Sequence, residues 1–473
     1  MNWGTEDFYE EENEINEAFN RYELMLKKGA KIYFDVIQIE YITERFIEEG
    51  KFMPALQAVD MGIEMHPTSI ALKVRKTNIL FNIGEIEQSL KLSNNLLSIE
   101  KTNHELHLLK GSALLLLDKK READQSFQLA LEYSIEDREE VLFNIGFAYE
   151  QSGNYKRAIH YMQKVLEINP YSDSALYEMA FSYEKINENE KSLEFYNQYL
   201  DIDTFSDSAW FNMGIIFTKL NRIEESIEAY EFALAVNEDF PNAWFNLGHS
   251  NMILARYKDA IEAFNTYIQY DDANDELFCL IGECYLKSDN LDEAYNNFQK
   301  AITFNKTNAQ AYFGVGLTLK LKSELYQSMK YLQKALNYDE KNSDYWYVMG
   351  EVSSILNYHD LADDSYREAC NLAPKNLTNW LGHAQMLYKK GRVIKAITIL
   401  NEAQNHHKNN ALINYRLAAY LLESDNEPKA IKYLEKALIN DYKNYDYLFD
   451  TYPEARYSDS VNKLISKYNP INS

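Results

Sequence analysis

Two consecutive stretches of the sequence repeat one pattern at a spacing of 34 residues. Residues 207–240 read DSAWFNMGIIFTKLNRIEESIEAYEFALAVNEDF, and residues 241–272 read PNAWFNLGHSNMILARYKDAIEAFNTYIQYDD. Trp210 aligns with Trp244, and Gly214 aligns with Gly248. A fixed period between 20 and 50 residues is typical of repeat architectures, so the pattern predicts an array of similar structural units.

The same period extends in both directions along the chain. One extra residue near positions 136–138 shifts the frame, and twelve units then cover Val36 to Asn444. The units begin at Val36, Ile70, His104, Glu139, Asp173, Asp207, Pro241, Asp275, Ala309, Ser343, Leu377 and Ala411. Because the composition is uniform along the array, we expect no domain boundary inside it.

Two positions of the unit accept only small residues. Position 20 is Ala or Ser in every unit: Ala55, Ser89, Ala123, Ala158, Ser192, Ser226, Ala260, Ala294, Ser328, Ala362, Ala396 and Ala430. Position 8 is Gly in seven units, from Gly111 to Gly350, and Thr or Ala in the others. Gly inside a helix costs about 1 kcal/mol relative to Ala. We therefore expect a compensating gain at position 8, in the form of close approach between two helix backbones.

The pattern resembles the tetratricopeptide repeat, which has a large apolar residue at position 4, small residues at positions 8 and 20, and often Pro at position 32. The unit that begins at Glu139 carries Leu142, Ile145, Gly146, Tyr149, Ala158 and Pro170 at the matching positions. The resemblance implies an all-α fold, a right-handed superhelical solenoid of tandem helix-turn-helix repeats. It also implies that the first helix of each unit, at positions 1 to about 14, lines a concave inner wall.

Segments outside the array predict a cap at each end. We assign residues 1–35 to an N-terminal capping helix, 36–444 to the twelve units, and 445–473 to a C-terminal capping helix and tail. The first helix is expected over Thr5–Lys28, with Gly29 as its stop. Its apolar face is expected to consist of Ile15, Phe19, Tyr22 and Leu26. The last helix is expected over Pro453–Lys467, where Val461, Leu464 and Ile465 are apolar. An acidic docking arm is the alternative for the first segment.

Composition restricts the function. The net charge is −25, which disfavours nucleic acid and anionic membrane surfaces as partners. The N-terminus carries neither a basic region nor an apolar run, so we expect a cytoplasmic protein. The sequence contains no phosphate-binding loop, metalloprotease motif or nucleophile elbow, and its His and Cys residues lack metal-ligand spacing. We therefore expect no enzyme activity, no cofactor and no metal.

Aromatic residues recur at position 5, which should face the concave wall. The series includes Phe143, Tyr177, Phe211 and Phe245, and Phe147 and Phe181 lie one helical turn further along their helices. Aromatic side chains in a groove give rigid anchors for a bound segment. The alternative is that these rings pack between adjacent first helices and contribute only to the core.

Asparagines recur at position 6 of three units: Asn144, Asn212 and Asn246. The series is similar to the inner-face asparagines of the O-linked N-acetylglucosamine transferase repeat domain. An amide both donates and accepts hydrogen bonds, so it can hold a peptide backbone of any sequence. Glu178 interrupts the series, and the basic positions of a chaperone-type carboxylate clamp are missing. Solvated or helix-capping amides are the alternative.

Lysines near the ends of first helices, Lys185 and Lys219 among them, would favour an acidic segment if they face the groove. Lysine near a helix C-terminus is also favoured by the helix dipole alone.

We therefore predict a non-enzymatic scaffold that binds an extended peptide or a partner helix in its concave groove. We expect a protein or peptide partner and a monomeric chain, with end-to-end or homodimeric association as the alternative. The sequence is also consistent with a structural repeat protein that uses its outer face or its ends, and with a regulatory subunit of a separate enzyme.

Overall fold

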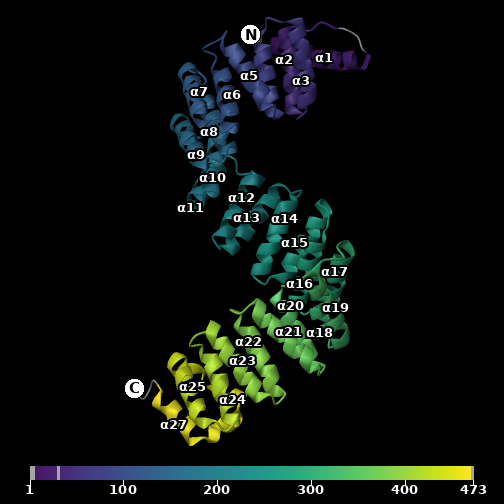
Figure 1. Cartoon of the computed structure of the whole chain (residues 1–473). Coiled ribbons are helices and arrows are strands. Elements are labelled where there is room, and N and C mark those ends of the chain that lie inside the picture. Colours follow the sequence, from purple (N-terminus) through teal and green to yellow (C-terminus); the bar gives the residue numbers. More distant parts are fainter. Residues whose placement is uncertain (1–5, 29–31, 470–473) are drawn as a thin grey trace. The chain divides into compact units, whose positions relative to one another are not determined.

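The fold is built from pairs of antiparallel helices, and within each of two compact units successive pairs pack against one another (Figure 1). The computed structural model describes residues 6–28 and 32–469, and for residues 6–16 it describes the backbone alone. All regular secondary structure in this part of the chain is helical. The chain is an all-α repeat solenoid, as the period predicts; its right-handed superhelical winding stays a prediction.

The first helices of the twelve pairs begin where the repeat units begin, apart from α8, which starts one residue earlier. They are α2 (Val36–Glu48), α4 (Ile70–Asn82), α6 (His104–Leu116), α8 (Arg138–Gln151), α10 (Asp173–Lys185), α12 (Asp207–Lys219), α14 (Pro241–Ile253), α16 (Asp275–Lys287), α18 (Ala309–Leu321), α20 (Ser343–Ile355), α22 (Leu377–Lys389) and α24 (Ala411–Glu423).

The second helices occupy positions 17 to 30 of most units. They are α3 (Phe52–Met65), α5 (Ile86–Leu97), α7 (Lys120–Tyr133), α9 (Tyr155–Ile168), α11 (Asn189–Leu200), α13 (Ile223–Val236), α15 (Tyr257–Tyr270), α17 (Leu291–Phe304), α19 (Leu325–Tyr338), α21 (His359–Leu372), α23 (Val393–His406) and α25 (Glu427–Asn440).

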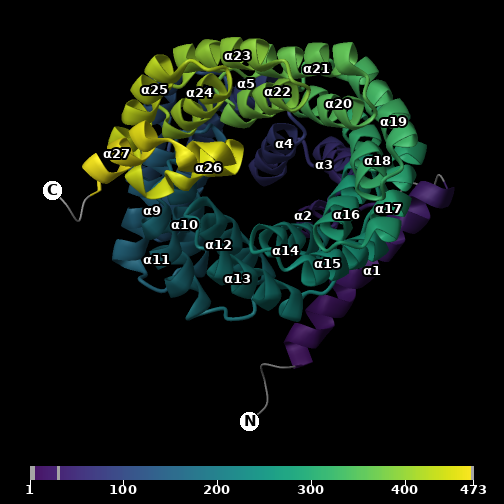
Figure 2. The same cartoon turned by 90° about the horizontal axis from the view of Figure 1, so that it is seen from below.

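The chain divides into two compact units, Met1–Glu238 and Asp239–Ser473. The uniform composition gives no sign of a division there. Within each unit, first and second helices form separate rows. In the second unit, Figure 2 shows an inner row of α16, α18, α20, α22 and α24 and an outer row of α17, α19, α21, α23 and α25. Side chains on the exposed side of the first helices therefore share one face.

The glycine at position 8 makes room for a side chain and not for a backbone, which corrects the expectation from the sequence. At Gly248, an added Cβ would lie 2.5 Å from Cε1 of Phe264, the residue at position 24 on the facing second helix. At Gly282 the same atom would lie 2.9 Å from Phe298. The ring at position 24 thus packs directly on the glycine, and this contact offsets the free-energy cost of Gly within a helix.

Position 20 is fully enclosed between the two helices of each pair. Ser226 donates within its own helix, to Ile223, whereas other Ser residues at this position reach across the pair: Ser192 donates to the carbonyl oxygen of Ala180 at 2.6 Å, and Ser328 donates to that of Gly316 at 2.6 Å. Both cross-pair acceptors are position-8 residues. The Ala and Ser series of the sequence thus marks the contact line of the two helices, and both of these hydroxyls are satisfied there.

Each pair turns at position 15, where the backbone is left-handed in all twelve units. In the turn after α12, Asn221 has a φ of 58°, and the N–H of Arg222 donates to the carbonyl of Phe217 at 2.9 Å. This arrangement is a Schellman motif, which closes a helix C-terminus. Gly, Asn and Asp fill most of these positions because they tolerate the left-handed region, whereas Ala255 occupies it with a φ of 56°.

The N-terminal helix α1 spans Glu6–Lys28 and packs against α2. Phe19 and Tyr22 are buried as expected, whereas Leu26 is exposed and Met25 is buried in its place. This difference reflects a rotation of the apolar face by about one residue. Thr5, the side chain of Ile15, and Gly29 lie outside what the structure describes.

The C-terminal segment forms three short helices, two of which replace the single helix that the sequence suggests over Pro453–Lys467. These are α26 (Asp446–Thr451), the 3₁₀ helix η2 (Pro453–Tyr457) and α27 (Asp459–Lys467), with a further 3₁₀ turn η1 (Tyr442–Asn444) before them. Helix α26 contacts α24, and α27 contacts α25, so the segment continues the two rows as a shortened pair. Val461 is fully buried beneath it, while Leu464 and Ile465 are half-buried.

Candidate functional site

A groove of the first compact unit lies on the exposed face of three successive first helices, α4, α6 and α8. Its cavity volume is about 670 Å³. Its floor is apolar and includes Leu108, Leu109 and Val141, and Leu116 and Phe147 remain 47% and 38% exposed. Apolar side chains stay exposed here because first helices of neighbouring pairs pack edge to edge and leave position 9 and position 13 uncovered.

Amide side chains stand along the same groove. Asn78 and Asn82 lie on α4, and the Asn82 amide donates to Oδ1 of Asn78 at 2.7 Å. Asn144 and Gln151 lie on α8. Ser112 of α6 adds a hydroxyl between them. The groove therefore combines an apolar floor with groups that both donate and accept hydrogen bonds, the combination that a peptide backbone with apolar side chains requires.

Carboxylates form the remaining part of the lining. Glu105 and Glu140 occupy position 2 of α6 and α8, and both side chains are exposed to the groove. Asp137 lies 3.6 Å from the ring of His104. Although solvent reaches Glu105, the surrounding groove walls raise the pKa of its carboxyl; Arg75 and His104 lower it and Glu140 raises it. The groove thus holds three carboxyl groups, and the pKa of one of them, Glu105, is raised by its surroundings.

The asparagine series does not act as one set. Asn144 lines the groove, whereas Asn212 is engaged inside the unit: its amide donates to the hydroxyls of Tyr177 at 2.9 Å and Tyr196 at 3.1 Å. Asn246 lies half-buried on α14 of the second compact unit. Asn212 therefore holds one buried and one half-buried phenol group in place, which reduces its availability to a ligand.

The aromatic rings at position 5 pack mainly on the second helix of their own pair. Tyr177 meets Tyr196 with ring centroids 5.5 Å apart, and Phe211 meets Tyr230 at 5.8 Å. In the second compact unit, Phe245 meets Phe264 at 5.9 Å. These contacts favour the core interpretation of the series, with a different packing partner from the adjacent first helices suggested by the sequence.

The other three predicted aromatics remain at least partly accessible. Phe143 is half-buried and stacks on Phe147 with centroids 6.3 Å apart, and Phe147 belongs to the groove. Phe181 of α10 lies beneath Lys185, whose ammonium is 4.4 Å from the ring centroid.

The predicted lysines form ion pairs within the repeat array. Lys185 and Lys219 both form ion pairs with the buried carboxylate of Glu184. In the second compact unit, Lys320 pairs with Glu351. Because Lys185 and Lys219 share one carboxylate, their charge is compensated in part, and the ion pairs and the helix dipole give both lysines a role within the array.

The sequence reasoning missed a pair of carboxyl groups next to these lysines. Glu150 at position 12 of α8 and Glu178 at position 6 of α10 are joined by a hydrogen bond, and Ser182 donates to Glu150 at 3.1 Å. Burial, with the adjacent charge of Glu178, raises the pKa of Glu150 to about 8. Glu178 interrupts the asparagine series at position 6. A carboxyl residue at that position, with another at position 12 of the preceding first helix, is the signal that could have revealed the pair.

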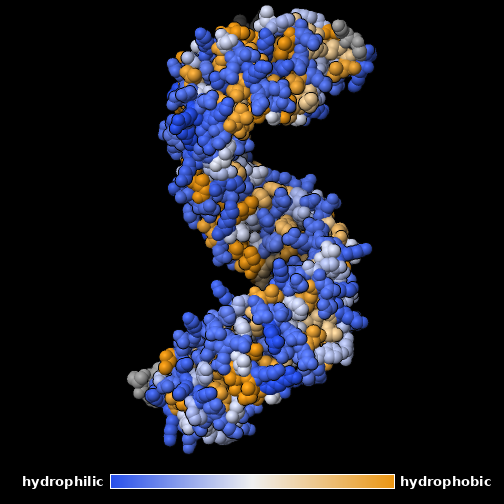
Figure 3. All heavy atoms as spheres, in the orientation of Figure 1, coloured by the Kyte–Doolittle hydropathy of each residue, from blue (hydrophilic) through white to orange (hydrophobic). Residues whose placement is uncertain are grey.

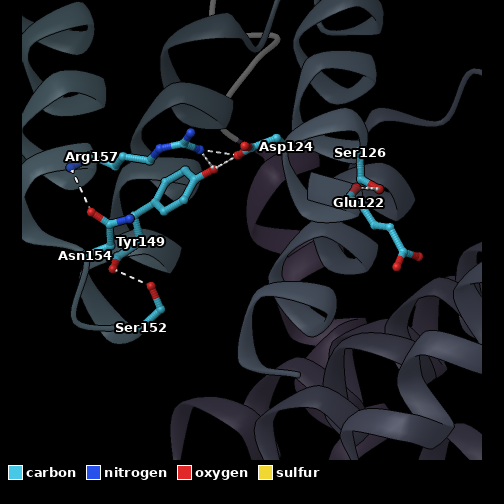
Figure 4. A network of polar contacts seen from close by, with 7 residues as sticks. All are labelled: Glu122, Asp124, Ser126, Tyr149, Ser152, Asn154 and Arg157. Carbon is cyan, nitrogen blue, oxygen red and sulfur yellow. Dashed lines mark hydrogen bonds and ion pairs between the residues drawn. The ribbon is translucent and has the colours of Figure 1, made fainter. Parts of the chain in front are cut away.

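A polar cluster on the side of the second helices joins two pairs. Tyr149 of α8 and Arg157 of α9 both donate to the carboxylate of Asp124 on α7, and Arg157 also donates to the Tyr149 hydroxyl at 2.6 Å (Figure 4). Tyr149 is buried, whereas Asp124 and Arg157 are partly exposed to solvent. The cluster lies away from the groove and serves packing between adjacent pairs.

Comparisons with known proteins agree with the fold. Models described as tetratricopeptide repeat match residues 139–172, 241–274, 275–308 and 343–376, and one described as TPR repeat matches residues 214–252. These parts of the chain are tetratricopeptide repeats, and repeats of this kind support a protein-interaction repeat scaffold. No curated protein sequence matches it.

Three solved structures resemble parts of the chain. YrrB, described as a TPR protein with an unusual peptide-binding site, is 18% identical, covers 39% of this chain and 95% of its own, and has a TM-score of 0.33. The Cut9–Hcn1 hetero-tetramer of the APC/C is 17% identical, with 87% and 92% covered and a TM-score of 0.38. The C-terminal part of a repeat protein from Cytophaga hutchinsonii is 16% identical, with 51% and 98% covered and a TM-score of 0.44.

The surface is mainly hydrophilic on the face drawn in Figure 3, with apolar patches between polar ones. Across the helices that the structure describes, none has the length and apolar character needed to cross a bilayer.

Proposed function

We propose that the chain binds a segment of a protein partner along the exposed face of its first helices, and that α4, α6 and α8 hold it. The observation that carries the proposal is the lined groove of about 670 Å³, which joins an apolar floor to amides on both sides. A cleft of this volume with few convergent polar groups is typical of a ligand-binding surface.

The two predicted residues that support this position are Asn144 and Phe147. Asn144 offers a donor and an acceptor to a peptide backbone, and the exposed part of Phe147 offers a flat apolar surface. The proposal keeps the predicted binding mode but moves its centre toward the N-terminus, because Asn212, Phe211 and Tyr177 are engaged in packing.

The test is selection of displayed random peptides on the full chain, followed by affinity measurement by fluorescence anisotropy. Two variants, Phe147→Ala and Asn144→Ala, remove an apolar and a polar contact. Asn246→Ala is the matched control, because it changes the same repeat position on α14 of the other compact unit. We expect at least a tenfold loss of affinity for each groove variant and no loss for the control, since buried contacts at a binding centre dominate affinity.

Circular dichroism of each variant must equal that of the wild type. If both groove variants bind the selected peptides with the affinity of the wild type, the proposed position is refuted. Association through the outer face or the ends would then explain the binding better.

A further inference from the structure

The groove on α4, α6 and α8 carries negative charge without a matching cation. Glu105 and Glu140 project into it, and within the described residues neither forms an ion pair. The neighbouring cations are engaged elsewhere: the guanidinium of Arg75 lies 2.6 Å from Glu44, and the ring of His104 faces Asp137.

The next first helix, α10, does not add to this negative charge. Lys185 and Lys219 share the single buried carboxylate of Glu184, and Lys185 also lowers the pKa of Glu150, which burial raises to about 8. The uncompensated negative charge of this face therefore comes from the groove carboxylates Glu105 and Glu140.

We propose that the partner segment in this groove is basic, with a lysine or arginine side chain placed between Glu105 and Glu140. This inference rests on the proposed function and adds the chemical class of the ligand to it. Two features of the groove fit a long cationic side chain in particular: the aliphatic stem packs on Leu108 and Phe147, and the charged end reaches the carboxylates.

The electrostatics of Glu105 support the same occupant. Its pKa is raised by enclosure and by Glu140, so its ionised form gains more from an added cation than a fully solvated carboxylate would gain. Arg75, His104, Glu140 and Asp137 are the other titratable groups that face this part of the groove. Binding should therefore weaken when the pH falls through the pKa of Glu105.

The test uses the full chain and positional nonapeptide libraries, each with one fixed central residue: arginine, lysine, glutamate or norleucine. Norleucine preserves the aliphatic stem and removes the charge. We expect arginine- and lysine-centred libraries to bind at least about tenfold more tightly than the norleucine library, because a hydrogen bond to a charged group contributes this much. We expect the double variant E105Q/E140Q to lose that preference.

A matched control separates a local effect from the overall net charge of −25. Glu276→Gln removes an exposed carboxylate at the same repeat position on α16, so it should keep the preference. Charge reversal with E105K/E140K should transfer the preference to the glutamate library. An equal loss of preference in the control would overturn the inference, because it would mean only general attraction to an acidic protein.

The outcomes for the two proposals can be distinguished. If Phe147→Ala abolishes binding of all libraries but arginine and norleucine bind equally, the groove is correct and the basic partner is wrong. If Phe147→Ala changes nothing, both proposals are wrong.

Discussion

Substitution of Gly248 by alanine tests the packing of a ring on the position-8 glycine. The added Cβ would lie 2.5 Å from Cε1, 2.7 Å from Cδ1 and 2.8 Å from Cζ of Phe264. Carbon atoms in contact are separated by about 3.5–4.0 Å, so the ring must retreat by roughly 1 Å. Overpacking of this kind costs about 1–3 kcal/mol, while Ala gains about 1 kcal/mol over Gly in a helix. The expected net loss of stability is therefore about 1 kcal/mol.

The appropriate assay is native-state hydrogen exchange by mass spectrometry on the full chain. A loss of about 1 kcal/mol corresponds to roughly fivefold faster exchange of the amides in α14 and α15. Amides of α24 and α25 should be unchanged, because each pair contacts only its neighbours.

The decisive control repeats the substitution in a Phe264→Leu background. Leu400 and Leu434 occupy position 24 opposite Ala384 and Ala418, so leucine and alanine are compatible at these positions. In that background the substitution should be neutral or stabilising, since the helix preference for Ala remains. An equal loss in both backgrounds would refute the packing argument.

Three further predictions concern the turns, the carboxyl pair and the polar cluster. Ala255→Gly should stabilise the α14–α15 pair by about 0.5–1 kcal/mol because alanine is strained in the left-handed region, and amide hydrogen exchange in this pair should become slower. Asn221→Ala should destabilise the α12–α13 pair for the same reason, and amide hydrogen exchange there should become faster. The pKa of Glu150 in the folded state is raised from 4.5 to about 8, so its ionisation opposes folding as the pH rises through that range. The melting temperature of Glu150→Gln should therefore exceed that of the wild type by a margin that grows between pH 5 and 8.5. A margin that is constant with pH would contradict the assignment. Asp124→Asn and Tyr149→Phe should be coupled by about 0.5–1.5 kcal/mol in a double-mutant cycle followed by urea denaturation, and additive effects would mean that the cluster contributes nothing.

The helix pairs and their register could be predicted from the sequence because small residues at positions 8 and 20 repeat in every unit. Gly214 and Ser226 suffice to place the contact line between α12 and α13, and the structure has that line where the frame puts it. The nature of the contact at Gly214 was not predictable in the same way. A series of small residues indicates that some group approaches the helix closely, and only the structure shows that this group is the ring at position 24.

The groove was predicted less well for a geometric reason. Residues at one position of the repeat, such as Asn144 and Asn212, recur at a fixed spacing and are therefore visible in the sequence. The groove instead combines different positions of three successive units, such as Asn78 at position 9 and Glu105 at position 2. Long side chains also reach into the next unit, as Lys219 does to Glu184, so the charge of a surface depends on pairs separated by about one period.

The left-handed residue between the two helices of each pair has a consequence for how such a chain can change in length. All twelve pairs end their first helix in the same left-handed turn, and the next pair starts from an equivalent position 34 residues later. A duplicated or deleted segment of one period therefore rejoins backbone geometries that already match. Unequal recombination between copies could lengthen or shorten the array by whole pairs, while an insertion of any other length would have to be absorbed in a loop, as the single extra residue before α8 is.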